Sequence, residues 1–141
     1  MKIKQKIGIV GNGFVGSAVR YGFSPSVGCD AEVKVYDKDP NKSTDKLSDV
    51  IKSDIIFLSV PTPSNLDGSM NIDIVDRALT DIDEHSTNAV ILLRSTVVPG
   101  TTRKLQDKYP NLRLVFNPEF LTERSANFDF INKDRVILGG D

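Results

Sequence analysis

Apolar and polar residues follow one another along this chain in blocks whose periods predict strands and helices in turn. Short, largely apolar runs bounded by glycine, proline or charged residues predict strands, and they lie at residues 7–10, 32–37, 54–60, 89–93, 112–116 and 135–138. Stretches with apolar residues three and four positions apart predict helices, and they lie at residues 13–21 (or 13–23), 45–52, 73–84, 101–109 and 122–131. This alternation of strands and helices is typical of an α/β fold.

The composition of the individual runs indicates where each strand lies in the sheet. Residues 54–60 and 89–93 are almost entirely apolar, which is typical of parallel strands covered by helices on both faces. Residues 32–37 alternate valine with charged side chains, so we expect a half-buried edge strand there. Six strands with helices or crossovers between them predict a doubly wound parallel sheet of the Rossmann type, in one domain over residues 1–141.

The first predicted strand ends in a glycine-rich turn, GNGFVG at residues 11–16, that leads directly into a helix. Such a turn suits a pyrophosphate. Gly11 permits a positive φ, Gly13 lets the backbone approach a ligand, and Gly16 lets the helix pack tightly on the strand. The free N–H groups and the dipole at the helix start then face the phosphates. Glycine turns are common, so the motif by itself leaves dinucleotide binding open and its context has to decide.

An acidic residue stands at the end of the second predicted strand, about 20 residues past the glycines. This residue, Asp37, is placed to bind a ribose hydroxyl, and its charge would repel a 2′-phosphate, which favours NAD over NADP. The alternative is an ordinary solvated turn acid. Asp39 is the nearest competitor for the ribose role.

Polar loops follow several of the other strands, at the edge of the sheet where ligands bind in open α/β folds. Pro61-Thr62-Pro63 is a stiff loop in which Thr62 either lies beside a ligand or is an idle hydroxyl next to a proline stop. Residues 117–123, NPEFLTE, carry two acids that either serve chemistry or simply favour a helix start. Two carboxylates and a hydroxyl can orient and deprotonate a water molecule.

Composition and charge exclude several classes of function. The net charge of −1 gives no reason to expect nucleic acid or an anionic membrane as a partner. Cys29 is the only cysteine, so no internal disulfide is possible, which fits a reducing compartment and a cytoplasmic protein. The short, glycine-broken apolar stretch behind the charged start at residues 1–6 predicts no signal peptide. No run approaches the ~20 apolar residues that span a bilayer.

Two residue types that often carry chemistry occur once each, in unpromising places. Cys29 has Asp30 and Glu32 beside it, whereas a reactive thiolate needs an electropositive neighbourhood or a base. His85 stands where the helix at residues 73–84 is expected to end, so a surface position favoured by the helix dipole is the better interpretation. We predict no metal site.

Taken together, the segments resemble the N-terminal NAD-binding domain of the UDP-glucose/GDP-mannose dehydrogenase family, and within it the UDP-glucose 6-dehydrogenases most. The segments that carry the resemblance are GNGFVG at 11–16, VYDKDPNK at 35–42, SVPTP at 59–63, RSTVVPGTT at 94–102 and NPEFLTE at 117–123, with DRVILGG at 134–140 in support. The resemblance implies an NAD-dependent enzyme that oxidises the C6 alcohol of a nucleotide sugar twice, to the acid.

The resemblance also implies roles for individual residues. NAD would contact Gly11, Asn12, Gly13, Phe14, Val15, Gly16, Asp37, Lys42, Val60, Pro61, Thr62, Thr96 and Glu123. The nucleotide sugar would border Glu119, Phe120, Leu121 and Glu123. Thr96 and Glu119 would hold an active-site water, and Glu123 would help to activate it, so these three are the implied catalytic residues.

Two departures from the family pattern shape the expectations for this chain. The family usually places a longer segment with its own strand between the positions of Asp37 and Asp54, whereas here there is room for one helix. We therefore expect the strand order 2-1-3-4-5-6, counted along this chain. The family's nucleophilic cysteine lies in a later domain and Cys29 is in the wrong place, so we expect this chain to lack the substrate and dimerisation domains and to be inactive alone.

Two other interpretations stay open at this point. One is a stand-alone NAD-binding module that senses or sequesters the cofactor without turnover. The other is a relative in the 6-phosphogluconate and hydroxyacid dehydrogenase group, which the VPTP and NPEFLTE segments disfavour. A homodimer is left open as well.

Overall fold

The computed structural model describes residues 4–140. The charged start at residues 1–6, which entered the prediction on a signal peptide, therefore lies partly outside the described residues. The elements, in chain order, are β1 Lys6–Val10, α1 Phe14–Gly22, η1 Pro25–Val27, β2 Glu32–Tyr36, α2 Leu47–Val50, β3 Ile55–Leu58, α3 Asp73–Glu84, β4 Val90–Leu93, α4 Thr101–Lys108, β5 Arg113–Phe116, η2 Glu123–Ser125 and α5 Ala126–Ile131.

Within residues 4–140 the strands form one sheet of five parallel strands in the order β2-β1-β3-β4-β5. The predicted α/β class, the parallel sheet and the half-buried edge strand β2 are confirmed. Strand β1 lies between β2 and β3, with Ile7 opposite both Val33 and Ile55. Among the described strands, β2 is the edge strand of the sheet, in agreement with the short connection after Asp37.

The predicted sixth strand at residues 135–138 is wrong. Residues 135–138 form no strand, and the pairing with β5 is an isolated antiparallel bridge at the next residue, Gly139. There the N–H groups of Phe116 and Gly139 each donate to the other residue's carbonyl, at 2.6 and 2.8 Å. Val136 and Leu138 are about 60% exposed. A parallel strand needs in-register pairing and a cover on its apolar faces. This segment has neither, so its apolar pattern does not become a strand.

Two helices are also shorter than expected. The first, α2, begins later than predicted because the residues before it are hydrogen-bonded to β2. Before α2, the N–H groups of Thr44 and Asp45 both donate to the carbonyl of Val35, and the Asp45 carboxylate accepts from the Val35 N–H at 2.9 Å. These bonds tie the loop to β2 and delay the helix to Leu47. The helix expected at residues 122–131 divides into η2 and α5.

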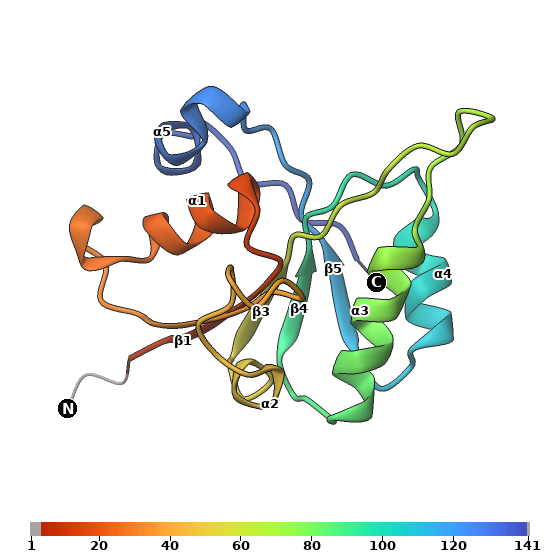
Figure 1. Ribbon diagram of the computed structural model, residues 1–141, viewed down its shortest axis with the longest axis horizontal. Coiled ribbons are helices and arrows are strands. Elements are labelled where there is room, and N and C mark those ends of the chain that lie inside the picture. Colours follow the sequence, from red (N-terminus) through yellow and green to blue (C-terminus); the bar gives the residue numbers. More distant parts are fainter. Residues whose placement is uncertain (1–3, 141) are drawn as a thin grey trace.

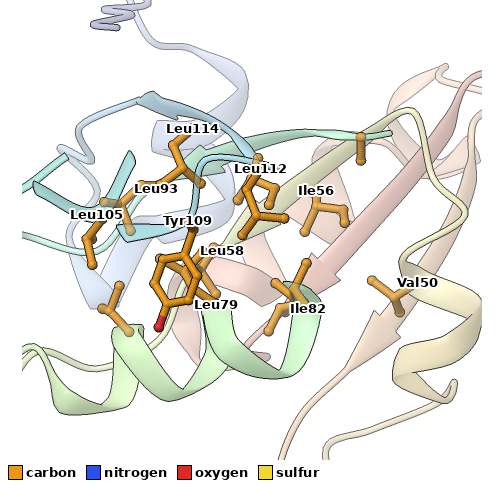
Figure 2. Close-up of a cluster of buried hydrophobic side chains, with 14 residues drawn as sticks. Val50, Ile56, Leu58, Leu79, Ile82, Leu93, Leu105, Tyr109, Leu112 and Leu114 are labelled. Atoms are coloured by element: carbon orange, nitrogen blue, oxygen red, sulfur yellow. The ribbon is translucent and has the colours of Figure 1, made fainter. Parts of the chain in front are cut away.

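Helices cover both faces of the sheet (Figure 1). Helices α1 and α5 pack on one face, where Val19 and Phe130 join the strand residues Ile9 and Phe57 in a buried cluster. Helices α2, α3 and α4 pack on the other face and enclose the larger cluster (Figure 2). The members labelled there are Val50, Ile56, Leu58, Leu79, Ile82, Leu93, Leu105, Tyr109, Leu112 and Leu114.

The strand order places a switch point between β1 and β3. The chain leaves β1 through α1 on one face and leaves β3 through α3 on the opposite face. The two following segments therefore diverge and leave a crevice at the carboxyl ends of these neighbouring strands, where ligands bind in doubly wound sheets. The fold thus predicts the location of a site before any side chain is considered.

Candidate functional site

A cleft of about 770 Å³ lies at this switch point; we call it the main cleft. Segments that follow β1, β2, β3, β4 and β5 all contribute to its wall. Its lining includes Gly11, Gly13, Phe14, Val15, Asp37, Lys42, Val60, Pro61, Thr62, Thr96, Glu119 and Leu121, all of which were predicted as site residues. Its lining also includes Lys38, Ser59, Ile74, Arg77, Ala78, Asp81 and Arg94, which sequence reasoning did not assign to a site.

The three glycines of the turn differ in what surrounds them. Gly11 has φ +92°, its N–H donates to the Tyr36 carbonyl at 2.9 Å, and a Cβ there would stand 2.5 Å from the carbonyl oxygen of Ser59. A Cβ on Gly16 would stand 1.9 Å from the Gly11 carbonyl oxygen, so this position keeps α1 against the turn. Gly13 has open space around it and lines the main cleft. Gly11 and Gly16 thus serve the fold, whereas Gly13 is the one with room for a ligand.

Asn12 fastens the glycine turn to the loop after β2. Its backbone N–H donates to the Asp37 carboxylate at 2.7 Å, and its side-chain amide donates to the Lys42 carbonyl at 2.8 Å. The Ser17 hydroxyl donates to the Asn12 side-chain oxygen at 3.0 Å. Asn12 is not part of the cleft lining, so it acts in this structure by fixing the positions of Asp37 and Lys42.

The structure separates the two acids that were candidates beside the turn. Asp37 lines the main cleft, and its carboxylate accepts the N–H groups of Asn12 and Asp39. The Asp39 carboxylate accepts from the backbone and side-chain N–H groups of Asn41, and it is not part of the cleft lining. Only Asp37 of this pair faces the site. A carboxylate has about four lone-pair positions, so Asp37 can still accept a hydroxyl from a ligand.

The loops after β3 and β4 are joined by side-chain hydroxyls. Thr62 Oγ1 donates to the carbonyl of Thr96 at 2.8 Å, and Ser95 Oγ donates to the carbonyl of Val60 at 2.6 Å. The Thr62 hydroxyl is therefore not idle, since it binds the backbone of a residue 34 positions away. These two bonds hold the central wall of the main cleft in one shape.

A buried ion pair closes the end of the main cleft nearest β5. Arg94, only 3% exposed, pairs with the Glu119 carboxylate and also donates to the side-chain oxygen of Asn117. Its guanidinium carbon lies 5.7 Å from the ring centroids of both Phe57 and Phe130. Burial lowers the pKa of Arg94 to about 10, which leaves it charged at neutral pH. Its Nε is buried without a hydrogen-bond partner among the described residues.

Arg94 is one of the site residues that sequence reasoning missed. The only signal available was a cation directly after the apolar run 89–93, inside the segment RSTVVPGTT. Its burial depends on Phe130 and Glu119, which are distant in sequence. A pattern along the chain does not show such a contact.

The predicted substrate residues are only partly brought together. Glu119 accepts from Arg94 and from the N–H of Leu121, and both Glu119 and Leu121 line the main cleft. Phe120 is 69% exposed and lines a second cavity of about 460 Å³, which also includes Arg94 and Glu119. Glu123 begins η2 and lines neither cavity.

The model of a known protein family matches most of this chain. The model described as UDP-glucose/GDP-mannose dehydrogenase family, NAD binding domain, matches residues 34–141. The chain belongs to the UDP-glucose/GDP-mannose dehydrogenase family. The glycine turn at residues 11–16 precedes the matched range.

Curated relatives in this family are much longer than the chain. A UDP-glucose 6-dehydrogenase of Haloferax volcanii is 31% identical over 124 residues, which cover 76% of this chain and 28% of that protein. A UDP-glucose 6-dehydrogenase of Campylobacter jejuni is 29% identical over 165 residues, covering 96% of this chain and 42% of that protein. The alignment with the Campylobacter jejuni enzyme is longer than this chain of 141 residues. Within the aligned region, that enzyme therefore has residues that this chain lacks.

Solved structures agree on the fold. A UDP-glucose dehydrogenase from Pyrobaculum islandicum superposes with a TM-score of 0.81 at 24% identity, covering 99% of this chain and 41% of that one. A GDP-mannose dehydrogenase from Pseudomonas aeruginosa, solved as a ternary complex, superposes with a TM-score of 0.78 at 22% identity, covering 94% of this chain and 40% of that one. The family's NAD-binding fold is therefore present here, in a chain that spans less than half of these relatives.

The remaining candidates, Cys29 and His85, do not line the main cleft. Cys29 is a free thiol that lines neither cavity. The His85 ring binds the carbonyl of Asp81 through Nδ1 at 2.7 Å, where α3 ends. The described residues include no group of three or more histidine, cysteine, aspartate or glutamate side chains placed to hold a metal ion. No helix within residues 4–140 is long and apolar enough to cross a bilayer.

Proposed function

We propose that this chain forms the cofactor-binding part of an NAD-dependent nucleotide-sugar 6-dehydrogenase, of the type that converts UDP-glucose to UDP-glucuronate. One observation supports this above all. The glycine turn, Asp37 and the Thr62–Thr96 pair come from four different parts of the chain, and all line one cleft at the switch point. This is where a doubly wound sheet binds a dinucleotide.

The residues present fit NAD. The open space at Gly13 and the uncapped start of α1 suit a pyrophosphate, and Asp37 suits a ribose with a free 2′-hydroxyl. Lys42 would contact the same end of the cofactor. Beyond the pyrophosphate, NAD would extend along Val60, Pro61, Thr62 and Thr96. When bound, the nicotinamide supplies the hydride acceptor for oxidation of an alcohol.

The other end of the main cleft suits the sugar. In this proposal the Glu119–Leu121 backbone borders the sugar, and Phe120 contributes from the second cavity. Thr96 and Glu119 hold a water molecule, and Glu123 helps to activate it. Arg94 and the Leu121 N–H already bind Glu119, so its carboxylate is oriented before any ligand arrives. Glu123 lines neither cavity in the structure, so this role requires Glu123 to move toward Thr96 and Glu119.

A binding module without turnover is the second candidate function. One observation favours it. The residues proposed to bind the cofactor line one cleft, whereas Cys29, the chain's single cysteine, lines neither cavity and so does not face the proposed sugar position. Under the first proposal, the family's cysteine nucleophile is supplied by a part of the protein beyond this domain. Both proposals predict that this chain alone binds NAD⁺ and does not turn over.

Isothermal titration with NAD⁺ and NADP⁺ tests the shared prediction. We expect NAD⁺ to bind more weakly than is usual for a complete dehydrogenase, because a second domain normally closes over the cofactor, and we expect NADP⁺ to bind more weakly still. Equal or tighter binding of NADP⁺ would overturn the role of Asp37. Absorbance of NADH on addition of UDP-glucose should not grow, and steady growth would show that the chain is active alone.

A turnover assay of the longest protein encoded by the same gene separates the two functions. Formation of NADH with a nucleotide sugar supports the dehydrogenase. Tight NAD⁺ binding without turnover, with UDP-glucose and GDP-mannose both tested, supports the binding module.

A further inference from the structure

Helix α5 rests on α1 through the ring of Phe130, which is only 9% exposed. The two helices lie side by side (Figure 1), and the ring lies over Gly22 in the last turn of α1. A Cβ on Gly22 would stand 2.1 Å from ring atom Cε1 and 2.3 Å from Cδ1. Gly22 does not have a positive φ, so this position needs glycine for space and not for backbone freedom. The missing side chain leaves a notch in α1, and Phe130 fills it.

The same ring covers the guanidinium of Arg94. The guanidinium carbon lies 5.7 Å from the ring centroid of Phe130 and 5.7 Å from that of Phe57. A guanidinium within about 6 Å of a ring centroid is attracted to the ring, and more strongly where water is excluded. Arg94 Nε is buried without a hydrogen-bond partner in residues 4–140, so part of the guanidinium is held by packing alone. Loss of either ring should therefore let the guanidinium move.

Arg94 in turn holds the Glu119 carboxylate. Its Nη2 pairs with Oε2 of Glu119, and its Nη1 donates to the side-chain oxygen of Asn117. The other carboxylate oxygen, Oε1, accepts the Leu121 N–H. A carboxylate has about four lone-pair positions, so Glu119 can still accept from a water molecule while both of its oxygens are fixed. A displaced Arg94 should therefore turn this carboxylate.

We propose that Phe130 is a positioning residue for the Glu119 carboxylate and acts through Arg94. The notch at Gly22 seats its ring. Phe130 lines neither cavity, so it acts through its neighbours and not by touching a ligand. This role rests on the proposed function, in which Glu119 holds a water molecule at the sugar end of the main cleft. In that function α1 serves both ends of the cleft, because its first turn faces the pyrophosphate and its last turn seats the ring that orients Glu119.

Hydrogen exchange measured by NMR on this chain tests the role of Phe130. The reporter is the Leu121 amide, which donates to Glu119, and the reference is the Asn117 amide, which donates to a backbone carbonyl of β4 at 2.9 Å. In Phe130→Val we expect the Leu121 amide to exchange at least about tenfold faster than in the wild type. The Asn117 amide should stay within about twofold of the wild type, because its acceptor does not depend on Glu119.

Phe128→Val is the matched control, because Phe128 belongs to the same helix but is 67% exposed. Both amides should exchange in this variant as they do in the wild type. The Arg94 Nε–H resonance gives a second signature. It should move in Phe130→Val, where one of the two rings beside the guanidinium is gone, and stay in place in Phe128→Val.

A double-variant cycle tests the notch. Gly22→Ala places a methyl group against Cδ1 and Cε1 of the Phe130 ring, so it should by itself speed exchange of the Leu121 amide. The Phe130→Val side chain ends at Cγ and lacks the ring atoms that this methyl group would meet. Adding Gly22→Ala to Phe130→Val should therefore change the Leu121 exchange rate by less than about twofold. Equal effects of Gly22→Ala in the two backgrounds would overturn the proposal.

Two results would overturn the role of Phe130. One is a folded Phe130→Val in which the Leu121 amide exchanges as in the wild type. The other is an equal acceleration of the Leu121 and Asn117 amides, because that reports general loosening and not a displaced Glu119. If Phe130→Val does not fold, Phe130→Leu keeps more apolar volume without the ring, and it should speed the Leu121 amide selectively; no selective change there overturns the proposal.

Failure of the proposed function would look different, and turnover of the longest protein encoded by the same gene reveals it. Where the wild type oxidises a nucleotide sugar, Phe130→Val should lower kcat at least about tenfold and leave KM for NAD⁺ within about twofold, because the cofactor end keeps its contacts. An unchanged kcat overturns the proposal. If the exchange responses appear as expected but the wild type gives no turnover, the proposed dehydrogenase is wrong and the positioning of Glu119 by Phe130 stands.

Discussion

The guanidinium of Arg94 and the carboxylate of Glu119 form an ion pair between β4 and the loop after β5, where the main cleft meets the second cavity. Their side chains are only 2% and 9% exposed. Breaking such a buried pair from one side leaves a charge without compensation, which costs far more than the pair itself contributes. The cost of a substitution should therefore depend on what the variant leaves for the remaining charged partner.

Arg94→Met should lower the free energy of unfolding by about 3–5 kcal/mol, because it leaves Glu119 buried without its cation. Glu119→Gln leaves the Arg94 charge without its counter-charge but keeps an oxygen that accepts from Arg94, so its cost should be smaller, about 1–3 kcal/mol. Urea unfolding followed by circular dichroism measures both. A cost below about 1 kcal/mol for Arg94→Met would show that the pair is not formed in solution.

The glycine turn offers a test that separates folding from ligand binding. Gly16→Ala places a methyl group against the Gly11 carbonyl oxygen and should destabilise the domain by at least about 3 kcal/mol. Gly13→Ala meets open space, so stability should change by less than about 1 kcal/mol. NAD⁺ affinity of Gly13→Ala should nevertheless fall at least about tenfold, because the methyl group stands where the backbone approaches the pyrophosphate. Unchanged NAD⁺ affinity in a folded Gly13→Ala would place the pyrophosphate elsewhere.

The bond from Thr62 to the Thr96 carbonyl has a matched counterpart far from the cleft. Thr87 Oγ1 donates to the Ile51 carbonyl at 2.6 Å, a bond of the same type, and it also accepts the N–H of Ala89 at 3.1 Å. Thr62→Val should cost about 0.5–1.5 kcal/mol of stability, and Thr87→Val should cost more, because it also removes the acceptor of the Ala89 N–H. Only Thr62→Val should also weaken NAD⁺ binding, because Thr62 lines the cleft and Thr87 does not. Equal NAD⁺ affinity in the two variants would contradict a role for Thr62 in the site.

Stability should depend on pH through Asp76, which joins α3 to α4. Burial raises the pKa of Asp76, but hydrogen bonds from Lys108 and Tyr109 outweigh it and hold the pKa below the usual 3.8. A carboxyl with a lowered pKa in the folded state stabilises the fold above its unfolded pKa and loses that contribution as pH falls. Asp76→Asn should therefore lose less stability than the wild type between pH 5 and pH 2.

Urea unfolding at several pH values measures this difference. Lys108→Met removes one of the two donors and should flatten the same part of the profile. An Asp76→Asn profile parallel to that of the wild type would show that Asp76 is not the titrating group.

Local sequence by itself determined most of the secondary structure and the parts of the cofactor cleft that lie at strand ends. The helix predicted at residues 73–84 is α3, Asp73–Glu84, because the spacing of its apolar residues leaves one stripe to bury. Gly11 and Asp37 directly follow strands and Thr62 lies in the loop after β3, so all three could be predicted, because parallel strands end at the same edge. The sequence favoured Asp37 over Asp39 for this position, whereas the loop hydrogen bonds that direct the Asp39 carboxylate to Asn41 are seen only in the structure.

The tertiary structure alone decided what depends on neighbours distant in sequence. An apolar run at residues 135–138 does not become a strand, because only the residue after it, Gly139, pairs with β5 and the side chains of Val136 and Leu138 stay exposed. Arg94 becomes a buried residue only because β4 and β5 are adjacent and Phe130 packs across from them. The Asp37 carboxylate accepts the Asn12 N–H only because β1 and β2 are neighbours in the sheet. Periodicity along a chain reports which faces are buried, and it carries no information about which charged or polar groups then meet.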